Sequence, residues 1–306
     1  MALTVIRPGM LTTIQDLGRW GFQGSGVPVA GPMDWYSHRL ANRLVGNDEQ
    51  AALLEITLIG PELEADAETM CVATGADFDV TVNGGVTQAA TPFMVPPGGR
   101  LRFGARRRGA RAMLAVRGGF DVAATFGSRA TSVIARMGPL ERPLMTGDVL
   151  PVGAAATVRP EATGSALRLP DGGARLRILR GPHDAMFTSD TWHTLLRSRY
   201  VVTPDSNRMG YRLKGPSLLH HGDAEILSDA TPIGSLQVPG SGEPILLMAD
   251  RQTTGGYPKI ATVITADLPL AGQLAPGDWI EFEACTRPAA IDALRVLAAE
   301  LTGLAR

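Results

Sequence analysis

Turn-forming residues are the feature of this sequence that most limits its fold. The 306 residues include 36 glycines and 22 prolines, nearly one residue in five, against about one in eight in an average protein. They separate short runs of apolar and β-branched residues, such as residues 3–7 and 245–249. Because frequent turns suit short strands better than long helices, the sequence predicts a mainly β fold with a few helices.

Local patterns place these elements along the chain. Asn83-Gly84-Gly85, between two valine- and threonine-rich runs, is typical of a tight hairpin, since Asn and Gly tolerate positive φ. Strands are expected at 3–7, 62–64, 70–74, 79–82, 100–103, 112–116, 175–179, 200–203, 224–227, 234–238, 245–249, 259–265 and 278–283. Helices are expected at 33–45, 189–197 and 288–301, where apolar residues follow a helical period.

A compositional break suggests two domains. Residues 153–174 mix small and polar residues and end in the turn cluster Pro170-Asp171-Gly172-Gly173. We therefore expect an N-terminal β-rich domain over 1–165 and a C-terminal β domain over 174–306 that ends in a helix.

Composition excludes several classes of protein. With 29 basic and 30 acidic residues, the chain lacks the excess positive charge with which nucleic-acid binders neutralise phosphates. No apolar stretch approaches the roughly 20 residues that span a bilayer, and residues 1–10 lack the apolar core of a signal peptide. Two cysteines and five scattered histidines suggest neither a disulfide framework nor a metal site. A cytoplasmic protein that binds no nucleic acid, membrane or metal is expected.

The window 250–259 is the richest candidate site. It lies between two predicted strands, and Gly255-Gly256 would let a ligand approach the backbone closely. Its polar side chains come from Asp250, Gln252, Thr253, Thr254, Tyr257 and Lys259. This set suits a small molecule with carbonyl, amide or carboxylate groups. A plain polar turn explains the same residues, and the sequence leaves both interpretations open.

Two further windows contain candidate residues. Asn207-Arg208 would present a planar guanidinium suited to bidentate carboxylate binding, although a surface salt bridge is the alternative. The glycine-rich stretch 14–34 contains Asp16 and Arg19 and leads into the first predicted helix. Such a loop either lines a binding site or only changes the direction of the chain.

Several ordered motifs together resemble one family. They are Thr13-Ile14-Gln15-Asp16-Leu17-Gly18-Arg19, Gly31-Pro32-Met33-Asp34, Asp205-Ser206-Asn207-Arg208-Met209-Gly210-Tyr211 and Asp250-Arg251-Gln252-Thr253-Thr254-Gly255-Gly256-Tyr257-Pro258. The chain resembles the biotin-dependent carboxyltransferase family, also called allophanate hydrolase subunit 2 or KipA-like, which includes the C subunit of bacterial 5-oxoprolinase. The resemblance implies two β-barrel-like domains, the C-terminal half being cyclophilin-like.

The resemblance also implies a function. We expect a hydrolase subunit of the ATP-dependent 5-oxoprolinase type, active on a small amide or lactam only with partners. The implied partners are a KipI or allophanate hydrolase subunit 1-like protein and a LamB/YcsF-like protein. Two alternatives remain open: the carboxyltransferase component of a biotin-dependent urea or amide carboxylase, and a KipA-type regulatory binding protein without catalysis.

Cofactors are expected on the partners. The sequence contains no glycine-rich ATP-binding motif, and neither Lys214 nor Lys259 lies in the Ala-Met-Lys-Met turn at which biotin is attached. We therefore expect this chain to bind no cofactor itself. ATP, and in the carboxylase alternative biotin, would be bound by partner subunits.

Motif position and chemistry together assign roles to the candidate residues. Asp250, Lys259 and Arg208 are the predicted catalytic residues, with Arg208 and Lys259 neutralising a substrate carboxylate or a developing oxyanion. Asp250, Gln252 and Thr253 would orient the amide. Thr254, Gly255, Tyr257 and Asn207 would contact the substrate, and Asp16 with Arg19 would close the site from the N-terminal domain.

Overall fold

The structure, a computed structural model, describes residues 1–155 and 165–303 and contains two compact units. Unit 1 comprises the described residues of Met1–Arg19, Ala30–Leu169 and Ala299–Arg306, and unit 2 comprises Trp20–Val29 and Pro170–Ala298. The main division, at residues 169 and 170, lies inside the predicted break at 153–174, of which residues 156–164 lie outside the described residues. Two segments do not follow a single boundary: residues 20–29 belong to unit 2, and residues 299–303 belong to unit 1.

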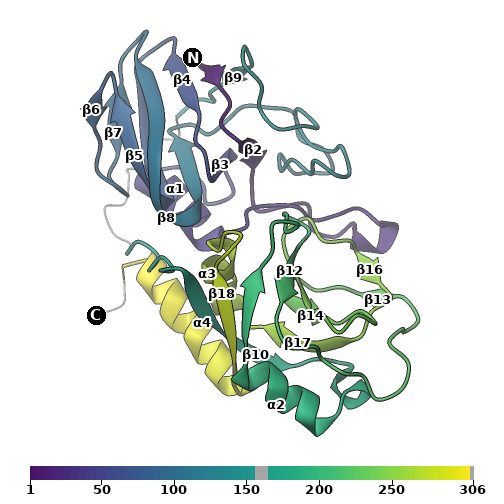
Figure 1. The fold of residues 1–306 in the computed structure, drawn as a ribbon. Coiled ribbons are helices and arrows are strands. Elements are labelled where there is room, and N and C mark those ends of the chain that lie inside the picture. The colour runs from purple at the N-terminus through teal and green to yellow at the C-terminus, as the bar shows by residue number, and fades with distance from the viewer. Residues whose placement is uncertain (156–164, 304–306) are drawn as a thin grey trace. The chain divides into compact units, whose positions relative to one another are not determined.

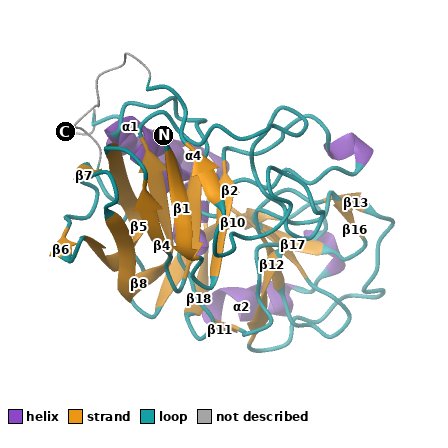
Figure 2. Cartoon of the chain, turned by 90° about the horizontal axis from the view of Figure 1, so that it is seen from above, coloured by secondary structure: helices purple, strands orange, loops and turns teal. Residues whose placement is uncertain are grey.

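Unit 1 is built on a curled, open sheet (Figures 1 and 2). Its strands pair in the order β2-β3-β8-β4-β1-β9, and β5 pairs with β8, β6 and β7. The bounds are β1 (Ala2–Arg7), β2 (Leu11–Gln15), β3 (Leu53–Thr57), β4 (Glu62–Ala65), β5 (Thr69–Val82), β6 (Gly85–Val86), β7 (Phe93–Val95), β8 (Arg100–Val116) and β9 (Val149–Pro151). The helix α1 (Trp35–Leu44) packs against β5 and β8.

Two long strands replace four predicted short ones. Predicted strands 70–74 and 79–82 are both part of β5, and 100–103 and 112–116 are both part of β8. The two strands pair through the charged segments that separate the predicted strands, with register shifts between Gly75 and Val80. Cross-strand ion pairs accommodate the charges: Arg107 lies 2.7 Å from Asp79, an opposite-charge pairing that stabilises neighbouring strands.

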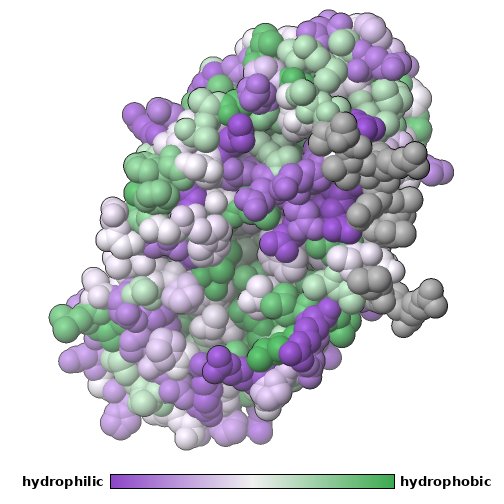
Figure 3. All heavy atoms as spheres, turned by 180° about the vertical axis from the view of Figure 1, so that it is seen from behind, coloured by the Kyte–Doolittle hydropathy of each residue, from purple (hydrophilic) through white to green (hydrophobic). Residues whose placement is uncertain are grey.

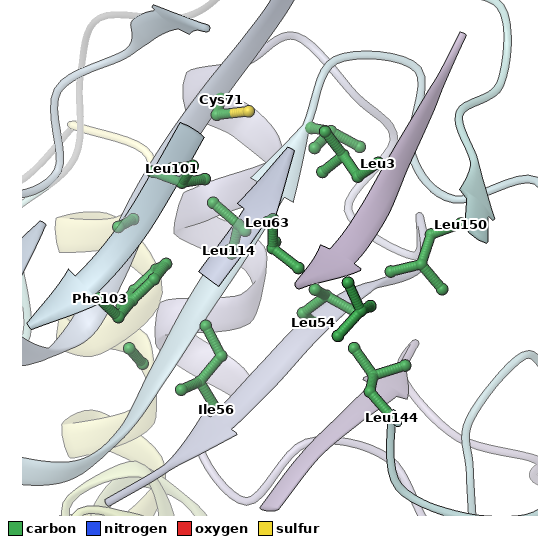
Figure 4. Packing of buried hydrophobic residues seen from close by; sticks show 14 of the residues in the cluster. Leu3, Leu54, Ile56, Leu63, Cys71, Leu101, Phe103, Leu114, Leu144 and Leu150 are labelled. Carbon is green, nitrogen blue, oxygen red and sulfur yellow. The ribbon is translucent and has the colours of Figure 1, made fainter. Parts of the chain in front are cut away.

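Alternating apolar residues form the core of unit 1. In β1, Leu3 and Val5 are buried while their neighbours are partly exposed. Figure 4 shows Leu54, Leu63 and Leu114 close together, each from a different strand. Full burial of such a side chain contributes about 1.5–3 kcal/mol. Cys71 is fully buried in this core, and burial raises the pKa of its thiol to about 12.

Unit 2 is built on a closed barrel in the order β10-β17-β14-β15-β12-β11-β18 (Figure 1). The bounds are β10 (Gly173–Arg180), β11 (Arg199–Val202), β12 (Gly210–Lys214), β14 (Ser235–Gln237), β15 (Ile245–Leu247), β17 (Lys259–Val263) and β18 (Trp279–Ala284). Parallel pairing of β10 with β18 closes it, beginning at Gly173 opposite Trp279. A Cβ at Gly173 would lie only 2.3 Å from the Trp279 ring, so glycine is required where the barrel closes.

The remaining elements of the described chain are a two-stranded sheet and several helices. β13 (Asp229–Ala230) pairs with β16 (Thr254–Gly255) outside the barrel. The remaining helices are α2 (Ser189–Arg197), α3 (Leu268–Gly272) and α4 (Arg287–Leu301), with 3-10 turns η1 (Gln23–Ser25), η2 (Asp184–Met186) and η3 (Thr265–Asp267).

The predicted fold class, mainly β with a few helices and barrel-like sheets, is confirmed. The three predicted helices correspond to α1, α2 and α4, and the Asn83-Gly84 turn has positive φ at both residues. The predicted strand at 224–227 is wrong: Leu227 is 95% exposed, and no strand is assigned there. The short helix α3 and the strands β2, β3 and β12 were not predicted.

The surface mixes side chains of opposite character. Figure 3 shows one face on which hydrophobic residues lie in small groups among hydrophilic ones. Within the described residues, none of the helices has both the length and the apolar character needed to cross a bilayer.

Candidate functional site

The predicted window 250–259 is a loop of unit 2 between β15 and β17, as expected. A neighbouring segment around β13 holds it in place. The Thr231 backbone N–H donates to the Thr253 carbonyl at 3.1 Å, and the Thr231 hydroxyl donates to the Gln252 carbonyl. The Ile226 N–H donates to the Gly256 carbonyl at 2.9 Å. The loop therefore has a defined backbone, although only three of its residues belong to strands: Thr254 and Gly255 in β16 and Lys259 at the start of β17.

Arg208 and Asp250 form a buried ion pair at the start of this loop. Nε and Nη2 of Arg208 donate to the two carboxylate oxygens of Asp250 at 3.0 and 2.9 Å, and the side chains are only 5% and 2% exposed. The Asp250 N–H also donates to the Arg208 carbonyl at 2.8 Å. This ion pair fixes the start of the loop, and the predicted contact of Arg208 with a substrate carboxylate stays a prediction.

Lys259 lies at the other end of the loop and is also buried, at 1% exposure. Its Nζ donates to Asp229 Oδ2 at 2.8 Å and to the Ala230 carbonyl at 2.9 Å. The hydrogen bond from Lys259 holds the pKa of Asp229 below its usual range. Because Asp229 and Ala230 are the two residues of β13, Lys259 fixes the strand against which the loop rests.

His183 completes this cluster. The Lys259 backbone N–H donates to His183 Nδ1 at 3.3 Å, so the ring proton of the neutral imidazole is on Nε2, which lies 3.9 Å from Asp229 Oδ2. Burial, and secondly the Lys259 charge, lower the pKa of His183. The histidine is therefore a neutral neighbour of the Lys259–Asp229 pair at pH 7.

A cavity of about 200 Å³, here named the amide cavity, opens beside the loop. Side-chain amides of Gln237, Gln252 and Asn207 line it, together with Tyr257. Gln252 Nε2 lies 3.4 Å from Gln237 Oε1, and Gln237 Nε2 lies 3.4 Å from the Tyr257 carbonyl. These long contacts leave the amides with donor and acceptor capacity for a ligand.

Gly255 provides the space that these amides occupy. A Cβ at this position would lie 2.8 Å from Gln237 Nε2 and 3.2 Å from Gln252 Nε2. Any larger residue would push the glutamine side chains toward the cavity. Gly255 itself lines neither cavity, and its predicted contact with the substrate stays a prediction.

A second cavity of about 310 Å³, here named the Trp20 cavity, shares Gln252 with the first. Its apolar lining includes Trp20, Val29 and Pro232, and its polar lining includes Arg251 and Thr253 as well as Gln252. Segment 20–29, which contains η1, lies beside β13 and β16 (Figures 1 and 2). Part of the glycine-rich early stretch thus joins the 250–259 loop within unit 2.

Arg251 is almost completely buried at 7% exposure. Its Nε donates to the Thr231 carbonyl at 2.7 Å and its Nη1 to the Met248 carbonyl at 3.4 Å. Burial lowers its pKa to about 10, an effect that the nearby Asp250 charge partly opposes. Among residues 1–155 and 165–303, no carboxylate lies within 4 Å of this guanidinium.

Several predicted residues therefore lie together in unit 2. Gln252, Tyr257 and Asn207 line the amide cavity, and Gln252 and Thr253 line the Trp20 cavity. The other predicted residues stabilise the loop through two ion pairs, Arg208 with Asp250 and Lys259 with Asp229. Thr254 is exposed on β16 and lines neither cavity.

Asp16 and Arg19 belong to unit 1, where they form internal hydrogen bonds. Asp16 accepts hydrogen bonds from the Gly18 N–H at 2.9 Å and the Ser128 hydroxyl at 2.6 Å. Arg19, 1% exposed, donates to the carbonyls of Thr125 and Ala130. These bonds tie the early motif to the 125–130 loop, and the predicted role in closing the site stays a prediction.

Sequence reasoning missed Arg251, Gln237 and Trp20. Arg251 belongs to the most unusual window of the chain but was not distinguished from the other arginines. Gln237 is a buried polar residue of β14, but the predicted strand 234–238 also contains Gly234 and Ser235, so no local signal distinguished it. Among the described residues, no cluster of histidine, cysteine and acidic side chains could hold a metal ion.

Comparisons with known proteins agree with this architecture. The chain is 40% identical to the 5-oxoprolinase C subunit of Escherichia coli over 292 residues, 95% of this chain and 94% of that protein. It is 35% identical to urea amidolyase of Lachancea kluyveri over 313 residues, but these are only 17% of that protein. The crystal structure of Kluyveromyces lactis urea carboxylase superposes with a TM-score of 0.94 at 32% identity, covering 99% of this chain and 29% of that one.

A family model confirms the resemblance seen in the motifs. The model described as carboxyltransferase domain, subdomain A and B, matches residues 25–284. This span includes both cavities except for Trp20 and Gln23. The chain therefore belongs to the carboxyltransferase family defined by subdomains A and B.

Proposed function

We propose that this chain is a subunit of an ATP-dependent amidohydrolase of the 5-oxoprolinase type, which hydrolyses a small lactam together with partner subunits. The observation that carries the proposal is the 40% identity to the 5-oxoprolinase C subunit over nearly the full length of both proteins. The relative's name describes one part of a larger enzyme, so the activity belongs to an assembly. The proposed partners are a KipI-like protein and a LamB/YcsF-like protein.

The amide cavity supports a lactam substrate. A cyclic amide presents a carbonyl acceptor and an N–H donor side by side, and carboxamide side chains offer the complementary pair. Gln237 and Gln252 supply such groups from the wall of one cavity. The phenol of Tyr257 and the amide of Asn207 add further polar groups.

Hydrolysis would place specific demands on these residues. The ring C–N bond breaks, the oxygen of water adds to the carbonyl carbon, and the ring nitrogen takes a proton. Negative charge develops on the carbonyl oxygen, so fixed N–H donors beside it lower the barrier. Gln252 is the donor that we place there, and Lys259 holds its loop through β13. ATP, bound by a partner, would supply the driving force.

A carboxyltransferase role is the second candidate function. The structural match to urea carboxylase favours it, since urea is also a small amide. In that case biotin would arrive on a partner, because Lys259 is buried and ion-paired. A KipA-type regulatory protein would bind its KipI-like partner without turning over either substrate.

Reconstitution with the partner subunits separates these functions. The 5-oxoprolinase type predicts ATP hydrolysis that depends on 5-oxoproline and yields glutamate. Carboxylation of urea that depends on a biotin carrier would contradict the proposal in favour of the second candidate. A stable complex that is inactive in both assays would indicate regulation.

The two lysines of the chain provide a matched pair of variants. Lys259→Met should abolish turnover of the reconstituted complex without preventing assembly, because β13 loses its anchor. Lys214→Met changes an exposed lysine at the end of β12 and should leave turnover unchanged. Normal turnover in Lys259→Met would refute the role given to Lys259.

A further inference from the structure

The position of Arg251 requires an explanation that the fold does not supply. A buried charge is costly unless it is paired, and Arg208, which lies between β11 and β12, satisfies this rule through its ion pair with Asp250. Arg251 has only two carbonyl partners, and no carboxylate of the described residues lies within 4 Å of its guanidinium. A neutral carbonyl does not cancel the charge.

The free side of this guanidinium faces a cavity. Arg251 lines the Trp20 cavity, and its two hydrogen bonds occupy Nε and Nη1. Nη2 has no acceptor in the described chain, yet it is not among the atoms sealed from solvent. A planar guanidinium with an open nitrogen in a partly apolar cavity is suited to a carboxylate.

The neighbouring residue connects this anion site to the amide cavity. Gln252 follows Arg251 directly and lines both cavities. A five-membered lactam with a carboxylate on the ring could thus present its amide to Gln252 and its charge to Arg251. Trp20 and Pro232 would contact the apolar ring.

We propose that Arg251 is the residue that makes the site selective for a lactam acid, by binding the substrate carboxylate in the Trp20 cavity. This inference rests on the proposed function and refines its substrate class. It transfers to Arg251 the carboxylate contact that motif position assigned to Arg208. Neutral lactams and urea lack the group that Arg251 recognises.

Equilibrium binding to the assembled complex without ATP tests this inference, with 5-oxoproline and the neutral lactam 2-pyrrolidinone as calorimetric probes. Arg251→Gln should weaken 5-oxoproline binding about 30- to 100-fold, because a charge-assisted pair is lost. Binding of 2-pyrrolidinone should change less than about twofold, because a neutral ring makes no such pair. Arg295→Gln, which changes an exposed arginine, is the matched control and should bind both ligands normally.

A second variant leaves Arg251 in place. Gln23→Glu introduces a carboxylate among the residues that line the Trp20 cavity. This carboxylate would compete with the substrate carboxylate for the Arg251 guanidinium. It should weaken 5-oxoproline binding about tenfold and leave 2-pyrrolidinone binding unchanged. This variant keeps the test valid if Arg251→Gln does not fold.

Each other outcome overturns the inference. Equal loss of both lactams in a folded Arg251→Gln complex would show a structural role. If Arg251→Gln loses bicarbonate binding but still binds 5-oxoproline, Arg251 recognises the carboxyl group that a carboxyltransferase would transfer, and not the substrate carboxylate. If the wild type hydrolyses 5-oxoproline and both variants bind it normally, only this inference falls. If the wild type neither binds nor hydrolyses it, the proposed function falls as well.

Discussion

Arg19 of unit 1 and Arg251 of unit 2 are both almost fully buried, and both donate to backbone carbonyls. Arg19 joins loops of unit 1 beside Asp16, which accepts hydrogen bonds from Ser128 and Gly18. Arg251 instead lines a cavity. The comparison teaches that two equally distinctive motifs can have different surroundings: Arg19 is enclosed by hydrogen bonds to loops of unit 1, whereas Arg251 borders a cavity.

Other buried polar residues also differ in their surroundings between the two units. In unit 1, His38 of α1 is fully buried, and its Nε2 lies 3.3 Å from the Gln15 carbonyl. In unit 2, the buried polar residues Gln237, Asp250 and Lys259 surround the loop that lines the cavities. Changes in unit 1 should therefore affect stability, whereas changes in unit 2 should affect stability and binding together.

The largest effect is expected for Asp250→Asn. This change removes the counter-charge of Arg208, whose side chain is only 5% exposed. Loss of one member of a buried pair typically lowers the free energy of unfolding by about 3–5 kcal/mol. Urea unfolding measures it, and Asp292→Asn, whose partner Arg295 is exposed, should change it by less than about 1 kcal/mol. Equal effects at the two positions would contradict the importance of the buried pair.

The next largest effect concerns His38 and pH. Burial lowers the pKa of His38 from 6.5 to about 4, so the folded chain keeps the ring neutral over a range in which the unfolded chain protonates it. Stability is therefore lost as pH falls from about 6.5 to about 4, by roughly 3 kcal/mol. The difference in unfolding free energy between wild type and His38→Gln should show this slope. Parallel pH profiles would contradict it.

A smaller effect on stability is expected for Gly255→Ala. The new Cβ would meet flexible glutamine side chains at 2.8 and 3.2 Å, and these can shift. The unfolding free energy should fall by less than about 1 kcal/mol. The KM for the lactam should nevertheless rise severalfold, because Gln237 and Gln252 would move into the amide cavity. An unchanged KM would separate these amides from substrate binding.

Local sequence patterns were sufficient for many elements of both units. Alternating runs and turn signals located β1, β10 and most other strands, and α2 has the predicted bounds. The 250–259 window was correctly placed between strands because glycines and flanking apolar runs are local signals. The continuity of β5 and β8 was missed because it depends on backbone pairing between residues far apart in the sequence, such as Phe78 opposite Arg106.

The candidate site depends on longer-range facts. Arg208 and Arg251 look alike in the sequence, and only the folded chain shows that Asp250, 42 residues from Arg208, pairs with that arginine. The sequence also gives no sign that segment 20–29 belongs to unit 2, so the contribution of Trp20 to a cavity could not be predicted. Local chemistry thus pointed to the loop that borders both cavities, but it did not distinguish the arginine that lines one of them.

The most direct test of this account is a crystal structure of the assembled complex with 5-oxoproline bound in the absence of ATP. The account predicts the lactam within hydrogen-bond distance of the Gln252 side chain, with its carboxylate on the Arg251 guanidinium. A 5-oxoproline molecule bound away from both the amide cavity and the Trp20 cavity would contradict it.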